Sequence, residues 1–245
     1  MHESLDKSAL AYRNQQFLDT PEARSLRILS EYLYPLSHFR QQKIHDTIVF
    51  FGSARTLELG PLGRYYNEAR ALAKRITEWS DGLDASGRRF VVCTGGGPGI
   101  MEAANRGARD AGAPSIGFNV ELPDEQEPNA YSTPELTFQF HYFAMRAAAL
   151  VVFPGGFGTF DEFFEILTLV QTGKMKRVPI VVIDRQYWSR VVNFPLLLEE
   201  GMISPKELDS FAFADDAEEA WAALVAGGLT VPPDRGVEPR ADVAP

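Results

Sequence analysis

The chain has 245 residues, 45% of them hydrophobic and 23% charged, with a formal net charge of −9 at pH 7. This composition is that of an ordinary globular protein, and the acidic balance argues against a protein that coats nucleic acid. No apolar run approaches the ~20 residues of a membrane span and no signal segment opens the chain, so we expect a cytoplasmic protein with no membrane partner.

The two ends of the chain differ in character from the rest. Residues 1–20 are polar and weakly patterned, and we expect a flexible arm; residues 232–245 are rich in proline, glycine and charge, which predicts a disordered tail. Residues 21–231 show no repeat or change of composition and predict a single domain. Its first helix follows Pro21 and carries apolar residues at helical spacing: Leu26, Ile28, Leu29, Tyr32, Leu33 and Leu36. We expect this helix to pack outside the core or on a second subunit.

Short apolar runs alternate with helical patterns along the domain. Strands are predicted at 47–51, 90–93, 115–122, 136–143, 149–153 and 178–183. Helical patterns are predicted at 62–79, after each of two glycine loops, at 188–198 and at 217–224. Because the strands are apolar throughout, we predict an α/β fold: a doubly wound, mainly parallel sheet with helices on both faces.

Two glycine loops each end a predicted strand and open a helix. They are Thr94-Gly-Gly-Gly-Pro-Gly99 and Pro154-Gly-Gly-Phe-Gly158. Helix N-termini carry unpaired N–H groups that bind anions. Neither loop is a P-loop, since no Gly-Lys-Ser/Thr follows, and Ile100 stands where a dinucleotide fingerprint needs glycine. A dinucleotide-dependent oxidoreductase is therefore disfavoured, and two loops converging on one phosphorylated ligand are favoured.

The first loop with Ile100-Met-Glu-Ala, and the second with Thr159-Phe-Asp-Glu162, closely resemble the LOG family. The resemblance runs from about Ile48 to Ile203. It implies a Rossmann-like sheet, a homodimer or higher homo-oligomer with the active site near the subunit interface, no cofactor, and hydrolysis of nucleoside 5′-monophosphates. The family's older label, lysine decarboxylase, would require a lysine that holds pyridoxal phosphate, and neither loop contains one.

Cleavage of the N-glycosidic bond passes through a cationic sugar, so it needs an anion, a proton donor for the departing base and a grip on the phosphate. Glu162 suits the first role; the alternative is a carboxylate that only complements the helix dipole. The expected phosphate and substrate contacts are Gly96, Gly97, Gly99, Gly155, Gly156, Gly158, Thr159, Ser53, Arg55 and Thr168. The expected substrate is AMP or a cytokinin nucleotide, and the products are free base and ribose 5-phosphate. With a single cysteine, Cys93, a Cys-based zinc site is excluded, and we expect no metal.

The chain departs from the family at its catalytic arginine. The family places an arginine on the helix before the second loop, in a Met-x-x-Arg-Lys setting, and Arg146 is the matching candidate. However, Ala147 stands where lysine is expected, and Arg146 lies only eight positions before Pro154. By this spacing Arg146 matches a later arginine of the family's helix rather than the catalytic one, so this helix looks shortened. His141 and Tyr142 are the possible substitutes. The shortening also supports a second hypothesis, a catalytically silent nucleotide-binding protein that uses the same loops.

Overall fold

The computed structural model describes residues 10–83, 86–119, 129–139 and 146–229. Within them, seven strands form one sheet in the order β4-β3-β2-β1-β5-β6-β7, and every neighbouring pair is parallel. The strands are β1 (Thr47–Phe51), β2 (Val91–Thr94), β3 (Ile116–Asn119), β4 (Thr137–Gln139), β5 (Ala147–Val152), β6 (Ile180–Ile183) and β7 (Ala212–Ala214). The predicted doubly wound α/β fold is confirmed.

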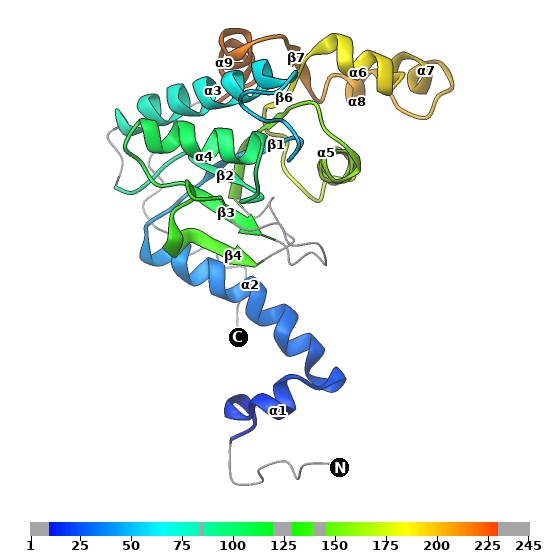
Figure 1. Cartoon of the computed structure of the whole chain (residues 1–245). Coiled ribbons are helices and arrows are strands. Elements are labelled where there is room, and N and C mark those ends of the chain that lie inside the picture. The colour runs from blue at the N-terminus through cyan, green and yellow to red at the C-terminus, as the bar shows by residue number, and fades with distance from the viewer. Residues whose placement is uncertain (1–9, 84–85, 120–128, 140–145, 230–245) are drawn as a thin grey trace.

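Helices cover both faces of this sheet (Figure 1). The described α-helices are α1 (Gln15–Leu18), α2 (Arg24–Gln41), α3 (Gly63–Asp81), α4 (Ile100–Asp110), α5 (Phe157–Gln171), α6 (Arg185–Val191), α7 (Phe194–Glu199), α8 (Pro205–Leu208) and α9 (Ala217–Ala226). Short 3-10 turns lie at Ala11–Arg13, Pro21–Ala23 and Pro134–Leu136. None of the described helices is long and apolar enough to cross a membrane.

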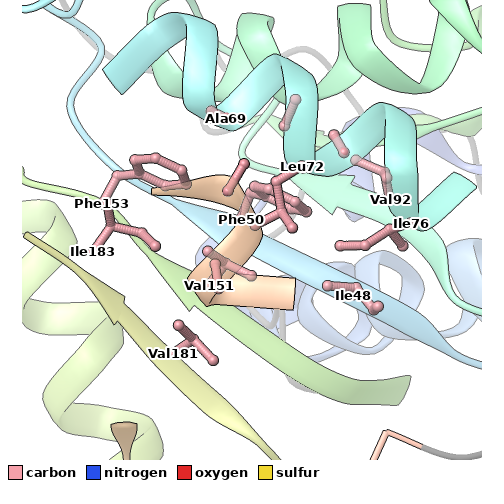
Figure 2. Close-up of a cluster of buried hydrophobic side chains, with 14 of the residues drawn as sticks. Ile48, Phe50, Ala69, Leu72, Ile76, Val92, Val151, Phe153, Val181 and Ile183 are labelled. Carbon is pink, nitrogen blue, oxygen red and sulfur yellow. The ribbon is translucent and has the colours of Figure 1, made fainter. Parts of the chain in front are cut away.

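The core consists of two apolar layers, one on each face of the sheet. On one face α3, α4 and α9 pack over alternate residues of the central strands, and Figure 2 shows Leu72 and Ile76 of α3 above Ile48 and Phe50 of β1. On the other face lie α5, α6, α7 and the C-terminal end of α2. The strands β1, β2 and β6 are buried along their whole length, which explains why their sequences are almost entirely apolar.

The direction of winding reverses between β1 and β5. From β1 the chain proceeds outward through β2, β3 and β4, and β5 then returns to the other side of β1 before the chain continues through β6 and β7. In open α/β sheets, ligands bind at the carboxyl ends of the two strands that flank such a switch point. Here those ends carry Gly52-Ser53 and Pro154-Gly155.

Two elements differ from the prediction. The single helix expected at 188–198 is two helices, because the chain is extended at Val192 and Asn193 then caps α7 by accepting a hydrogen bond from the Leu196 amide. The edge strand β7 was not predicted, since three residues are too few to show a periodicity. The predicted strand 136–143 is described only as far as residue 139, and the predicted tail at 232–245 lies outside the described residues.

The long helix α2 contacts the domain mainly through its C-terminal end. Pro35 and Phe39 are its buried residues, and Phe39 packs near Phe118 of β3. Its N-terminal part leads away from the sheet and ends beside α1 (Figure 1). In this part the large apolar side chains are exposed. Of the two arrangements expected for this helix, packing on the outside of the core therefore holds only for its C-terminal end.

Candidate active site

Three loops meet at the carboxyl ends of β1, β2 and β5. The Ser53 amide donates to the carbonyl oxygen of Pro154 at 3.2 Å, which joins the loop after β1 to the loop after β5. The carbonyl oxygen of Ser53 accepts from the Ile100 amide, also at 3.2 Å, which joins it to the start of α4. The structure therefore brings Ser53 and both glycine loops together, as their positions in the sequence predict.

The loop after β5 forms an open helix N-terminus. Helix α5 begins at Phe157 with Gly156 as its N-cap, so the first-turn amides, including those of Gly158 and Thr159, lack partners four residues back along the helix. A Cβ atom built on Gly156 or Gly158 would meet nothing within 4 Å, so both face open space. The same atom on Gly155 would lie 2.0 Å from Oγ1 of Thr159, so Thr159 packs directly onto Gly155. This geometry suits an anion that approaches over Gly156.

A tyrosine of α6 holds this loop in place through a hydrogen bond to its backbone. The Tyr187 hydroxyl donates to the carbonyl oxygen of Gly155 at 2.6 Å. Tyr187 is itself placed by Asp184, which caps α6 by accepting from the Tyr187 amide at 2.9 Å. Asp184 is buried and left-handed (φ 70°), and its carboxylate also accepts from the Tyr65 hydroxyl and from Arg64. These residues were not predicted from the sequence. The available signal was the position of Asp184, which follows a strand and precedes a helix, as helix-capping aspartates do.

In the loop after β2, several backbone groups already form hydrogen bonds within the protein. The Gly96 amide donates to Oγ1 of Thr94 at 2.9 Å, and Asn129 binds the carbonyl oxygens of Gly96 and Gly97. The Gly96 N–H is therefore not available to a phosphate, which corrects the role expected for this residue. Gly99 (φ 69°) lets the loop approach Ser53, because a Cβ atom there would lie 2.3 Å from the Ser53 carbonyl oxygen. Gly99 thus serves the close packing of this loop against the loop after β1.

Glu162 lies half-buried in the second turn of α5, since the helix begins at Phe157 rather than near Thr159 as expected. The helix dipole acts mainly within the first turn, so complementing it does not explain this carboxylate. Burial raises the pKa of Glu162 from 4.5 to about 7, and the charges of Glu165 and Asp161 add to the effect. A carboxyl group that titrates near neutrality next to an anion site is suited to acid–base chemistry.

Arg146 does not reach this site. Its guanidinium donates to the carbonyl oxygens of Ile44 and His45, which precede β1, at 3.4 and 3.2 Å. Arg146 itself directly precedes β5, so it lies at the amino end of the sheet, and the six residues of β5 (roughly 20 Å) separate it from the glycine loop. The catalytic role expected for Arg146 is corrected accordingly. His141 and Tyr142, the possible substitutes, lie outside the described residues.

Of the remaining predicted residues, Ser53 and Arg55 lie in the loop after β1, whereas Thr168 lies further along α5. Oγ of Ser53 accepts from the Arg55 amide at 3.1 Å, and the Arg55 side chain is exposed beside the loops with no ion pair to any described residue. Thr168 is exposed, and its hydroxyl donates to the carbonyl of Phe164 within α5. Since it lies nine residues beyond Thr159, roughly 14 Å along the helix, it is not part of the glycine-loop site. Arg55 is thus the candidate cation for this site.

The described part of the chain contains no group of three or more His, Cys, Asp or Glu side chains that could hold a metal ion. Cys93 is fully buried in β2, and burial raises the pKa of its thiol.

Comparisons with known proteins agree with this architecture. The family model described as possible lysine decarboxylase matches residues 101–224, which include α5 and the second glycine loop. The probable cytokinin riboside 5′-monophosphate phosphoribohydrolase LOGL3 of Oryza sativa subsp. japonica is 27% identical over 192 residues, 76% of this chain and 85% of that protein. The cytokinin riboside 5′-monophosphate phosphoribohydrolase of Mycobacterium tuberculosis is 28% identical over 153 residues, 58% of this chain and 80% of that protein.

Among solved structures, the X-ray structure of the structural-genomics target TM1055 has a TM-score of 0.52 at 16% identity and covers 74% of this chain and 99% of its own. This similarity shows a shared fold. The family model matches half of the chain, and the name of the rice relative, LOGL3, is that of the family. The chain therefore belongs to the family described as possible lysine decarboxylase, the LOG family.

Proposed function

We propose that this protein hydrolyses the N-glycosidic bond of a purine nucleoside 5′-monophosphate, AMP or a cytokinin nucleotide, and releases free base and ribose 5-phosphate. The relatives' names supply the reaction class, since they are phosphoribohydrolases of cytokinin riboside 5′-monophosphates. The observation that carries the proposal is Glu162: a half-buried carboxylate in the second turn of a helix whose N-terminus is open to an anion.

The geometry suggests a division of roles. The 5′-phosphate binds over Gly156, at the first-turn amides of α5, with Arg55 adding a positive charge. Glu162, ionised, stabilises the positive charge that develops on the sugar and accepts a proton from the attacking water. The oxygen of water forms the new bond to C1′ as the C1′–N bond breaks, and the base leaves with the electron pair of that bond. The base takes up a proton from bulk water, and Glu162 returns its proton to bulk water, which restores the carboxylate.

Incubation with AMP and cytokinin nucleotides, followed by chromatography of the free base, tests the proposal. We expect the wild type to release base and ribose 5-phosphate in equal amounts. Glu162→Gln keeps the shape of the side chain and removes its charge, so it should lose at least ~100-fold in rate while retaining nucleotide binding. Absence of base release from every nucleotide at high protein concentration would contradict the proposal.

A second candidate function is supported by the position of Arg146. With this arginine at the opposite end of the sheet, the loops and Glu162 form a binding site that lacks the family's catalytic pair. In that case the protein binds a nucleoside monophosphate as a sensor or regulator without turnover. Thermal stabilisation by AMP without base release is the expected result for this function.

Two further properties belong to the proposal. We expect the protein to act in the cytoplasm, where nucleoside monophosphates occur, and to need no cofactor. We also expect a homo-oligomer.

A further inference from the structure

Asn129 holds two carbonyl oxygens of the loop after β2. The carbonyl oxygen of Gly96 accepts from the Asn129 backbone amide at 2.7 Å and from Nδ2 of the same residue at 2.9 Å. Nδ2 also donates to the carbonyl oxygen of Gly97 at 2.9 Å. Carbonyl oxygens carry a partial negative charge, so Asn129 binds the two groups of this loop that would repel an anion.

The side chain of Asn129 is itself fixed by hydrogen bonds at both of its polar atoms. Oδ1 accepts from the amides of Tyr131 and Ser132 at 3.0 and 3.1 Å, and Nδ2 also donates to Oδ1 of Asn105 at 3.0 Å. Asn105 is fully buried in α4, and its own amide group donates to Oγ of Ser115 at 2.9 Å. A flipped Asn129 amide would place an oxygen against three acceptor oxygens, so the network allows only one orientation.

This anchor also determines the direction of the next N–H group. No cis peptide bond occurs in the described residues, so the Gly97 N–H points opposite to the Gly96 carbonyl and thus away from Asn129. Asn129 belongs to a segment on the β3 side of the loop, because the Thr133 amide donates to the carbonyl oxygen of Ser115, directly before β3, at 3.1 Å. The Gly97 N–H therefore faces the β1 side, and within the described residues it has no acceptor.

The loop after β5 is held in the corresponding way from the opposite side. Tyr187 of α6 binds the carbonyl oxygen of Gly155, so the Gly156 N–H points away from α6, which follows β6. In the strand order β3-β2-β1-β5-β6, which Figure 1 shows, Asn129 and Tyr187 thus hold the two loops from their outer sides. The N–H groups that they orient both point toward the space beyond the end of β1.

We propose that Asn129 is a positioning residue for substrate binding, which directs the Gly97 N–H at the same phosphate that the Gly156 N–H binds. The carboxyl ends of β2 and β5 flank β1 and lie roughly 10 Å apart, and both loops contact the backbone of Ser53 between them. One anion can therefore receive donors from both loops. The inference rests on the proposed function, because it concerns the phosphate of the same ligand.

Calorimetric titration of the full chain with ribose 5-phosphate and with inorganic phosphate tests this inference, since hydrolysis of a glycosidic bond consumes neither probe. We expect a single ligand per chain. Asn129→Ala removes the side-chain hydrogen bonds to both carbonyl oxygens and should raise the dissociation constant of each probe three- to tenfold. Asn129→Asp keeps the shape of the side chain but places a carboxylate oxygen against three acceptor oxygens, so its loss of affinity should exceed about tenfold.

Thr133→Val is the matched control. The Thr133 hydroxyl accepts from the Ser115 amide at 3.0 Å, so it ties the same segment to β3 rather than to the glycine loop. The variant should lower thermal stability, as Asn129→Ala does, but its affinity for each probe should stay within about twofold of the wild type. With AMP as substrate, Asn129→Ala should raise KM by the same factor as the dissociation constants and leave kcat within about twofold.

Several results would overturn the inference. One is affinity of Asn129→Ala for both probes within about twofold of the wild type, and another is an equal loss in Thr133→Val, which would show that the whole segment has loosened. A wild type that binds neither probe at millimolar concentrations, or that binds two phosphates of which Asn129→Ala and Tyr187→Phe each lose a different one, would also overturn it. Binding as expected without adenine release from AMP would contradict the proposed reaction and leave the role of Asn129 intact.

Discussion

The Tyr187 hydroxyl and the Gly155 carbonyl oxygen lie 2.6 Å apart, and this hydrogen bond fixes the orientation of the peptide group between Gly155 and Gly156. The peptide plane between Gly155 and Gly156 is trans, so its N–H points opposite to its carbonyl. Because Tyr187 holds the carbonyl on the α6 side, the Gly156 N–H is directed away from α6. Gly-Gly peptides rotate easily, so a group that fixes this one preorganises the anion site.

Removing this hydroxyl should weaken phosphate binding. For Tyr187→Phe we expect a three- to tenfold rise in the dissociation constant for inorganic phosphate and in the KM for AMP, which corresponds to the ~0.5–1.5 kcal/mol of a typical hydrogen bond. Isothermal titration calorimetry with phosphate measures the first quantity. Tyr66→Phe is the matched control, because it removes a buried hydroxyl that donates to Glu102 at 2.7 Å on the other face of the sheet. Equal losses in both variants would show a general loss of stability rather than positioning.

The raised pKa of Glu162 predicts a dependence of stability on pH. Between pH 4.5 and about 7 the unfolded chain ionises this carboxyl while the folded chain keeps its proton, so Glu162 lowers the free energy of unfolding as the pH rises through that window. Glutamine does not titrate. The free energy of unfolding of Glu162→Gln relative to wild type should therefore rise by about 1–2 kcal/mol between pH 4.5 and pH 8, a value reduced for the exposed part of the side chain.

Urea denaturation at several pH values checks this prediction. Glu199→Gln, at an exposed glutamate of α7, is the control for loss of a carboxylate and should not reproduce the gain. A relative stability of Glu162→Gln that falls with rising pH would contradict the burial of this group.

The same titration bears on activity. If Glu162 acts in its ionised form, base release should increase through a single transition near pH 7 and reach a plateau above it. Rates of AMP hydrolysis measured from pH 5 to 9 under kcat/KM conditions give this profile. A rate that decreases with pH would assign Glu162 the role of an acid instead.

Two adjacent glycines should respond differently to alanine. In Gly155→Ala the new methyl group would overlap Thr159, with 2.5 Å to its Cβ atom, so we expect a loss of about 1–3 kcal/mol in the free energy of unfolding. In Gly156→Ala the methyl group enters open space and the fold should be retained, but it lies where the phosphate approaches. Thermal unfolding with phosphate titration separates the two effects; similar stability losses in both variants would contradict the packing described for Gly155.

Alanine variants of Arg146 and Arg55 should differ in their effects on stability and on ligand binding. Arg146→Ala removes contacts to the carbonyl oxygens of Ile44 and His45, so it should lower stability without a direct effect on phosphate affinity. Arg55→Ala should leave stability within about 0.5 kcal/mol and weaken AMP binding. A reversed result in calorimetry with AMP would return Arg146 to the site.

Much of the fold follows from local sequence signals. The strands around β1 and β5 are continuous apolar runs, and the glycine loops mark their ends, so both the sheet and its binding edge were predictable. The backbone amides that remain free to bind a ligand could not be predicted in the same way. The Gly96 N–H donates to the Thr94 hydroxyl, and this hydrogen bond depends on side-chain geometry that the spacing of the glycines does not encode. Tyr187 was missed because its contact to Gly155 spans 32 residues and two helices, and no local pattern reports such a pair.

The position of Arg146 shows a limit of predicting a residue's role from its match to a family motif. Its match to a family motif suggested a catalytic role, but the number of residues between it and Pro154 decides its place, because a residue directly before a strand lies at the amino end of the sheet. The spacing of eight positions between Arg146 and Pro154 already conflicts with the family's longer helix, and the structure gives the reason, since Arg146 directly precedes β5.

The central claim is that Glu162, beside the open N-terminus of α5, cleaves the glycosidic bond of a bound nucleoside monophosphate. Single-turnover release of adenine from AMP by wild type and Glu162→Gln, with AMP binding measured on the same samples, tests it most directly. The account predicts adenine release by the wild type, a loss of at least ~100-fold in the variant, and AMP affinities within about threefold of each other. Tight AMP binding by both proteins with equal or absent adenine release would contradict it.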